Sequence, residues 1–269
     1  MNASEKKPQE LYELGLHYLD NSRFDLAIPI FEELAGKMHG LSLYQLGHLY
    51  KSSKMKEVLR SFPAGLSGQD WEAKAKAYLR AAAGLGVPGA GYELGSLLER
   101  TEGDSEDAAF WLRKAAGDGH IKASSKLAGI YLRWGKLDGA ETYLRRAAES
   151  GDGQAAYDLA MLYFANRQRP PGFQRKLFSA LTEGQQRRIE NYKRAFPILV
   201  EAANLGCVEA QYRLGLLLWE GLTEFHAEIC PRDEVMADTL IKEAARQGHN
   251  GAARFLQDPT SDHPRRGLG

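Results

Sequence analysis

Small, apolar and polar residues recur along the chain in a fixed order that predicts pairs of amphipathic helices. One helix of each pair ends at an anchor alanine, and another alanine lies eight residues earlier. A turn follows, usually with a glycine, which adopts the left-handed backbone conformation at little cost. The next helix carries a leucine followed by a small residue. The anchor alanines are Ala35, Ala83, Ala116, Ala148, Ala203 and Ala245.

The spacing of the anchor alanines indicates the size of the repeat. Ala83, Ala116 and Ala148 are separated by 33 and 32 residues, which is the length of one helix pair. The wider intervals indicate material inserted between the first and second helix of a unit. In a solenoid this slot always lies on one edge, where inserted loops often bind partners. The predicted insertions lie near residues 52–70, 166–188 and 221–233.

Three segments carry the repeat most clearly, Gly91–Gly95, Ala108–Ala116 and Ala155–Tyr163, and together they resemble Sel1-like repeats. The resemblance covers about residues 10–257. It implies an all-α fold, a right-handed α-solenoid of about six helix-turn-helix units related to tetratricopeptide repeats. Such solenoids serve as adaptors or scaffolds, and the resemblance implies no chemistry.

The end of the chain differs from the repeats in composition. Pro259, Pro264 and terminal glycines follow the last predicted helix. Segments of this kind bury too little apolar surface to fold. We therefore expect a repeat domain over residues 1–257 and a disordered tail over residues 258–269.

Composition narrows the possible partners and the compartment. The 35 basic and 35 acidic residues cancel, so no whole-molecule field favours nucleic acid or an anionic membrane. The sequence shows no secretory signal and no apolar run of about 18 residues that could span a bilayer. The two cysteines, Cys207 and Cys230, are typical of a reducing compartment. We therefore expect a cytoplasmic, bacterial protein with no membrane partner.

Three positions on the first helix of each unit lie opposite the predicted buried face. Counted from the small residue that follows the leucine, they are three residues before it, one after it and four after it. Tyrosine recurs at the first position, and a row of tyrosines suits peptide binding in a concave groove. Alternatively, the tyrosines belong to the repeat and bridge neighbouring units. Residues at the other two positions are not dictated by the repeat. The predicted partner-binding residues are Tyr44, His48, Tyr92, Tyr157, Met161, Phe164, Tyr212 and Trp219.

The insertion near residues 166–188 is rich in basic side chains. Between residues 166 and 194 there are eight basic and two acidic residues, with Phe173 and Phe178 interleaved. This composition suits an acidic partner or a nucleic-acid backbone. The alternative is a solvated loop joined to the charged face of a helix. Arg187 and Arg188 are the predicted partner-binding residues of this segment.

The sequence offers no catalytic or metal-binding arrangement. His226, Glu228, Cys230 and Asp233 are metal-ligand types that lie close together, but their spacing matches no closed zinc pattern. No nucleophile–base set and no phosphate-binding loop is present. We therefore expect no metal, no cofactor and no enzymatic activity.

Together these features favour a non-catalytic protein–protein interaction adaptor or scaffold. It would bind a protein partner in the concave groove or along the edge that bears the insertions. One alternative is an immunity protein that neutralises a cognate toxin by occlusion. Another is an RNA-associated protein that uses the basic insertion, although nucleic acid is the less favoured partner. Self-association could also cover the groove aromatics.

Overall fold

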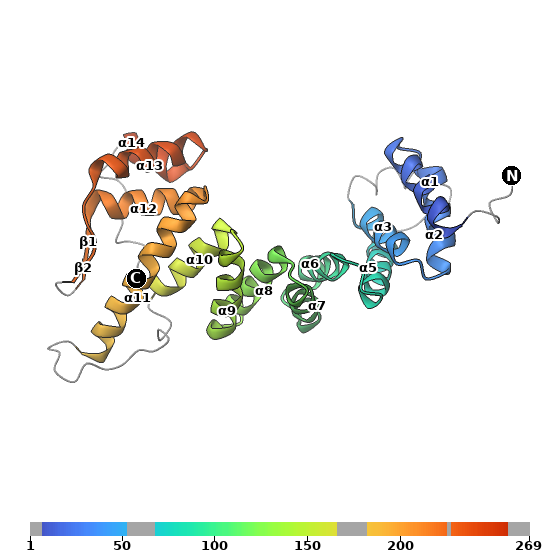
Figure 1. The fold of residues 1–269 in the computed structure, drawn as a ribbon, viewed down its shortest axis with the longest axis horizontal. Helices are drawn as coiled ribbons and strands as arrows, with labels where there is room; N and C mark the ends of the chain where they lie inside the picture. The colour runs from blue at the N-terminus through green and yellow to red at the C-terminus, as the bar shows by residue number, and fades with distance from the viewer. Residues whose placement is uncertain (1–6, 53–67, 166–181, 225–226, 258–269) are drawn as a thin grey trace. The chain divides into compact units, whose positions relative to one another are not determined.

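The structure is a computed structural model of an all-α repeat protein with one small β-hairpin (Figure 1). The predicted tail over residues 258–269 lies outside the described residues, as do most of the insertions near 52–70 and 166–188. The residues that the structure describes are 7–52, 68–165, 182–224 and 227–257.

The chain divides into two compact units, Met1–Lys126 and Leu127–Gly269, and α8 (Ile121–Arg133) continues from the first into the second. The first unit also contains α1 (Pro8–Asp20), α2 (Phe24–Gly36), α3 (Gly40–Lys51), α5 (Gly68–Gly84), α6 (Ala90–Glu102) and α7 (Glu106–Gly117). The second contains α9 (Leu137–Glu149), α10 (Gly153–Phe164), α11 (Glu183–Asn204), α12 (Val208–Glu220), β1 (Leu222–Glu224), β2 (Ala227–Cys230), α13 (Glu234–Arg246) and α14 (Asn250–Gln257).

The turns after the anchor alanines share one local geometry. After Ala116, the Gly119 N–H donates to the Ala116 carbonyl at 3.1 Å, and the His120 N–H donates to the Ala115 carbonyl at 3.0 Å. Gly119 has a φ of +91°, where a side chain would be strained. The equivalent residue of the first repeat, Met38, takes a similar conformation with a φ of 58°. The glycine pattern in the sequence therefore marks the helix ends.

The small residue after each leucine allows the two helices of a pair to approach closely. A Cβ atom added to Gly95 on α6 would lie 2.7 Å from the Leu112 Cγ and 3.1 Å from the Leu112 backbone nitrogen on α7. Gly47 meets Leu79 in the same way, at 2.6 Å from its Cγ. These contacts are closer than side-chain packing permits, so only glycine fits at these two positions.

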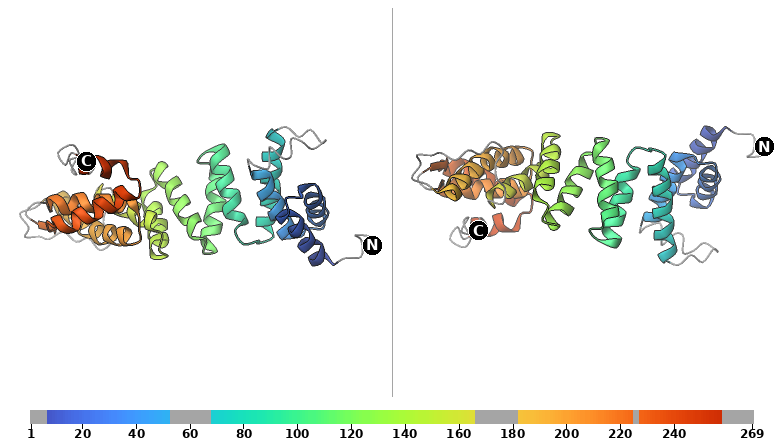
Figure 2. Two further views of the ribbon diagram at one scale, coloured as in Figure 1. Left: turned by 90° about the horizontal axis from the view of Figure 1, so that it is seen from above. Right: turned by 90° about the horizontal axis from the view of Figure 1, so that it is seen from below.

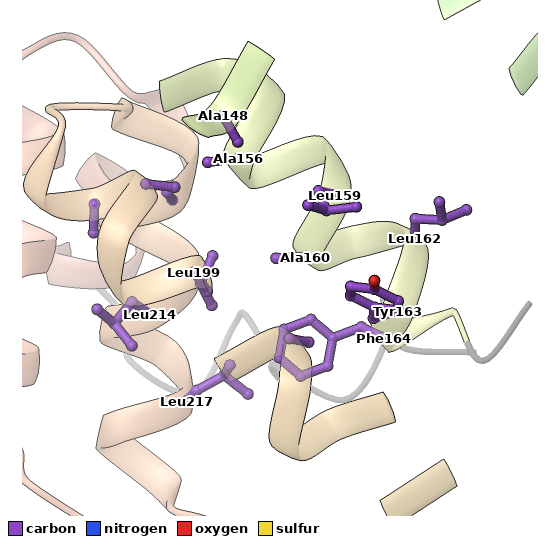
Figure 3. Close-up of a cluster of buried hydrophobic side chains, with 14 of the residues drawn as sticks. Ala148, Ala156, Leu159, Ala160, Leu162, Tyr163, Phe164, Leu199, Leu214 and Leu217 are labelled. Atoms are coloured by element: carbon purple, nitrogen blue, oxygen red, sulfur yellow. The ribbon is translucent and has the colours of Figure 1, made fainter. Parts of the chain in front are cut away.

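The core of the second unit is a layer of alanine and leucine side chains between successive helices. Figure 3 shows Leu159 and Ala160 of α10, Leu199 of α11, and Leu214 and Leu217 of α12 gathered in this core. α10 packs on α11, and α12 packs on α13 (Figure 2). Among the described helices, none is both long and apolar enough to cross a membrane.

Two features of the second unit were not predicted. The insertion near residues 221–233 contains an antiparallel hairpin in which Leu222 pairs with Cys230, and both side chains are buried. The basic insertion ends earlier than expected, because α11 begins at Glu183. Thr182 caps this helix by accepting the Gln185 N–H at 3.2 Å, while the Gln185 side chain accepts the Thr182 N–H at 2.8 Å. This capping box was visible in the sequence.

Candidate partner-binding site

Three tyrosines of the predicted groove position meet the histidine that begins the next repeat. The Tyr92 ring stacks on His120, with ring centroids 4.2 Å apart and an interplanar angle of 18°. Tyr212 lies over His249 at 4.4 Å, and Tyr12 meets His39 at 5.2 Å. Of the predicted contact residues, Tyr92 and Tyr212 thus join neighbouring repeats, and only part of each ring is exposed.

The same histidines cap the helices that they begin. The His120 Nδ1 accepts the Ala123 N–H at 3.3 Å, and the His249 Nδ1 accepts the Ala252 N–H at 3.0 Å. The His39 Nδ1 accepts the Ser42 N–H at 3.3 Å. Each cap satisfies a helix N–H that has no partner within its own helix. Each histidine therefore stabilises a repeat junction twice, through its ring face and through Nδ1.

Substitution of His120 separates these two contributions. We expect His120→Ala to lower the free energy of unfolding by about 2 kcal/mol, because it removes both the cap and the ring contact. His120→Asn should recover about 1 kcal/mol, because asparagine is a good helix cap but does not stack. Urea denaturation followed by circular dichroism measures both changes. Equal midpoints for the two variants would show that the cap does not contribute.

In the first unit, two predicted contact residues lie side by side on α3. The Tyr44 and His48 rings are 6.4 Å apart, and His48 is exposed. Tyr44 is half-buried, and this burial raises the pKa of its hydroxyl. The pair therefore presents one exposed ring and one that is partly enclosed.

In the second unit, Tyr157 and Met161 of α10 and Trp219 of α12 are all half-buried. α10 and α12 contact each other, and the repeat register predicts that all three positions lie opposite the buried face of their helices. In the structure, all three side chains pack partly against the core of the second unit. Trp219 rests edge-on against Phe255 of α14, with ring centroids 5.5 Å apart. We call the surface formed by Tyr157, Met161 and Trp219 the first-helix face.

Phe164 is a correction to the predicted set. It is 1% exposed and belongs to the core of the second unit, where its ring packs edge-on against Tyr192 at 5.3 Å (Figure 3). Tyr192 comes from α11, which is longer than the other helices because it begins within the insertion. The extended helix therefore covers a position that the repeat register alone would leave open.

The two predicted arginines are engaged within α11. Arg187 forms an ion pair with Glu183 at 3.1 Å. Arg188 donates from Nε to the Tyr192 hydroxyl at 3.2 Å, and its guanidinium lies 5.4 Å from the centre of the Tyr192 ring. The Glu183 carboxylate pairs with the charge of Arg187, whose Nε atom is buried without a hydrogen-bond partner. These two Arg188 contacts are to a neutral hydroxyl and an aromatic ring. The basic residues before Thr182 lie outside the described residues.

Sequence reasoning missed Arg213 of α12. The side chain is half-buried, and its Nε and Nη2 atoms are fully buried without a hydrogen-bond partner. Burial lowers the pKa of this guanidinium, and the hydroxyls of Tyr157, Tyr212 and Tyr192 act on the pKa in the opposite direction. A buried cation without a carboxylate partner is unusual, because desolvation disfavours the charged form.

The described residues hold no group of three or more histidine, cysteine or acidic side chains arranged to bind a metal ion. Of the four candidate ligands, His226 lies outside the described residues. Cys230 is 1% exposed, and burial raises the pKa of its thiol to about 12. This thiol is therefore protonated at neutral pH and is a poor ligand and nucleophile.

Comparisons with known proteins bear on the fold. No protein-family model and no curated protein matches the sequence. A solved structure, c5321, described as a protective antigen of uropathogenic Escherichia coli strains with an SLR fold, is similar with a TM-score of 0.63 and 22% identity. The match covers 93% of this chain and 48% of c5321, so the chain spans about half the length of that protein.

A second solved structure covers nearly the whole of both chains. The Sel1 repeat protein from Oxalobacter formigenes has a TM-score of 0.62 and 21% identity, over 96% of this chain and 95% of that one. The immunity protein Pa5087 from Pseudomonas aeruginosa has a TM-score of 0.42 and 19% identity over 90% and 83%, which is too low to support an argument. The predicted Sel1-like repeat fold is confirmed, and these similarities concern the fold alone.

Proposed function

We propose that the chain is a non-catalytic protein–protein interaction module that binds a partner segment on its first-helix face. The observation that carries this proposal is the set of half-buried large side chains at Tyr157, Met161 and Trp219. All three side chains also pack against the core of the second unit, and each keeps part of its surface exposed. Partly exposed aromatic side chains are the residue types that contribute most to protein interfaces.

The alternatives differ in the partner that they require. An immunity protein is the special case in which the bound partner is a toxin. RNA binding would need free cations, and Arg187 and Arg188 are already engaged with Glu183 and Tyr192. For these two side chains, the contacts support a protein partner over a nucleic acid.

The test is affinity capture from the source cells with the full chain as bait, followed by titration calorimetry with the purified partner. We expect Trp219→Ala to weaken binding at least 30-fold, because truncating a central aromatic residue of an interface costs about 2 kcal/mol or more. Met161→Glu should have a similar effect without disturbing the contact between Trp219 and Phe255.

Phe110→Ala is the control for loss of an exposed aromatic ring, because Phe110 is 52% exposed on α7 in the first unit. Its affinity should stay within about twofold of the wild type. Circular dichroism would verify that each variant is folded. A partner that binds all of these variants equally would contradict the proposed site, and capture of an RNA in place of a protein would contradict the function.

A further inference from the structure

Arg213 occupies a position that is polar in every repeat. This position lies two residues before the small residue of the first helix, on the side that meets the neighbouring repeat. The residues found there are Glu13, Gln45, Glu93, Lys126, Asp158 and Arg213. The partners of these equivalent residues can therefore be compared from one repeat to the next.

In the compact unit Met1–Lys126, Gln45, Glu93 and Lys126 at this position each contact a residue of the preceding repeat. Lys126 forms an ion pair with Glu99 at 2.7 Å, and Glu93 forms an ion pair with Lys51. Both partners lie four residues after the small residue of the preceding repeat. The Gln45 side chain donates to the Tyr12 hydroxyl at 3.4 Å. A partner from the preceding repeat is therefore the usual solution.

At Arg213 the partner is missing. The residue that would supply it, four positions after Ala160, is Phe164, which is buried in the core against Tyr192. No carboxylate among the described residues bonds to Arg213, and its Nε and Nη2 atoms remain unpaired. Asp158, the equivalent residue one repeat earlier, at least accepts a hydrogen bond from the Gln154 amide at 3.0 Å.

The surroundings of Arg213 suit an anion. Burial lowers the pKa of Arg213, and the Tyr157 and Tyr212 hydroxyls act on this pKa in the opposite direction. A phenol hydroxyl can also donate to a carboxylate oxygen. A guanidinium forms charge-assisted hydrogen bonds with carboxylates, which are stronger than hydrogen bonds between neutral groups. Because Nε and Nη2 are fully buried, a ligand would reach the guanidinium through Nη1, which is not among the fully buried unpaired atoms. Tyr157 also belongs to the first-helix face.

We infer that Arg213 binds the carboxylate of an aspartate or glutamate side chain in the partner segment that occupies the first-helix face. This inference rests on the proposed function and specifies the chemistry of the partner. The segment would place an acidic residue at Arg213 and apolar residues against Met161 and Trp219. Binding would thus provide the counter-ion that the preceding repeat lacks.

The test uses the full chain and a library of random twelve-residue peptides displayed with their C-termini fused, so that only side-chain carboxylates are presented. We expect the wild type to select peptides with an acidic residue at one fixed position beside apolar residues. In a synthetic amidated peptide, changing that residue to its amide should weaken binding by the wild type at least tenfold. The same change in the peptide should have little effect on binding by Arg213→Gln. The four affinities together form a double-mutant cycle for this one contact.

Arg146→Gln is the matched control, because it removes an exposed arginine of the same unit. It should respond to the peptide change as the wild type does. Arg213→Gln should also unfold at the same or a higher urea concentration than the wild type, since it removes an unpaired buried charge. A clear fall in its midpoint would show that the guanidinium is already satisfied in the free chain and would overturn the inference.

The remaining outcomes separate the two proposals. Two outcomes would overturn the role of Arg213 and leave peptide binding at the first-helix face intact. In one, the selected peptides show no preference for an acidic residue; in the other, the acid-to-amide change in the peptide weakens binding by Arg213→Gln as much as by the wild type. A second library would present free C-terminal carboxylates. If the protein selects such peptides there and shows no preference for acidic side chains in the first library, the proposed role of Arg213 is also overturned. If no peptide is enriched, or if Trp219→Ala binds all of them equally, the proposed function fails as well.

Discussion

Phe164→Ala is expected to lower the free energy of unfolding by about 4 kcal/mol, the usual cost of removing a buried phenylalanine ring. Phe164, shown in Figure 3, is 1% exposed, and its ring packs against Tyr192 of α11. The substitution would leave a cavity lined by helices that are tied to the rest of the core. Urea denaturation followed by circular dichroism and tryptophan fluorescence would measure the loss.

Phe110→Ala is the control for this prediction because it makes the same chemical change at a ring that is 52% exposed. We expect it to change the free energy of unfolding by less than about 1 kcal/mol. Similar losses for the two variants would contradict the burial of Phe164. The result also matters for binding experiments, because reduced partner capture by Phe164→Ala would report damage to the fold and not the loss of a contact.

Gly95→Val is expected to destabilise the first unit by about 3 kcal/mol. A Cβ atom at this position would already lie 2.7 Å from the Leu112 Cγ, and valine adds two further methyl groups. Part of the clash is with the Leu112 backbone nitrogen, at 3.1 Å, which cannot rotate away as a side chain could. Overpacking of this kind forces helices apart and costs about 1–3 kcal/mol or more.

Gly117→Val is the matched control on the same helix pair. Gly117 ends α7, and a Cβ atom there would meet nothing within 4 Å. We expect its free energy of unfolding to remain within about 0.5 kcal/mol of the wild type. Stabilities that are equal for Gly95→Val and Gly117→Val would mean that α6 and α7 are not held as closely as the structure describes.

Phe164→Ala and Gly95→Val both test the helix packing on which the proposed interaction module depends. In a repeat protein, stability is approximately the sum of the repeats and of the contacts between neighbours. Closely packed helix pairs hold the first helices in register, so side chains such as Tyr157 and Trp219 are presented on rigid elements. A partner can then bind without an additional cost for ordering the site. The histidine caps at the repeat junctions contribute to the same rigidity.

The basic insertion illustrates why sequence alone gave an incomplete account of the candidate site. The eight basic residues between 166 and 194 suit either an acidic partner or nucleic-acid backbone, or a solvated loop joined to the charged face of a helix. In the structure, Arg187 and Arg188 lie on a helix and contact Glu183 and Tyr192, each four residues away along the helix. Composition records the number of charges, but the contacts of each charge depend on the secondary structure that positions it.

The sequence by itself determined the repeat architecture. The anchor alanines, the turn glycines and the leucine that precedes a small residue predict helix pairs, because these signals act within one turn or between adjacent helices. The tertiary structure alone decided that Phe164 is buried, that Leu222 and Cys230 pair in a hairpin, and that Arg213 lacks a carboxylate. The surroundings of Phe164 and Arg213 depend on segments distant along the chain, such as Tyr192 on the extended α11, whereas the hairpin joins two strands that are close in sequence. No local pattern specifies which distant side chain will fill a given space, so burial and charge pairing at these positions follow only from the packed structure.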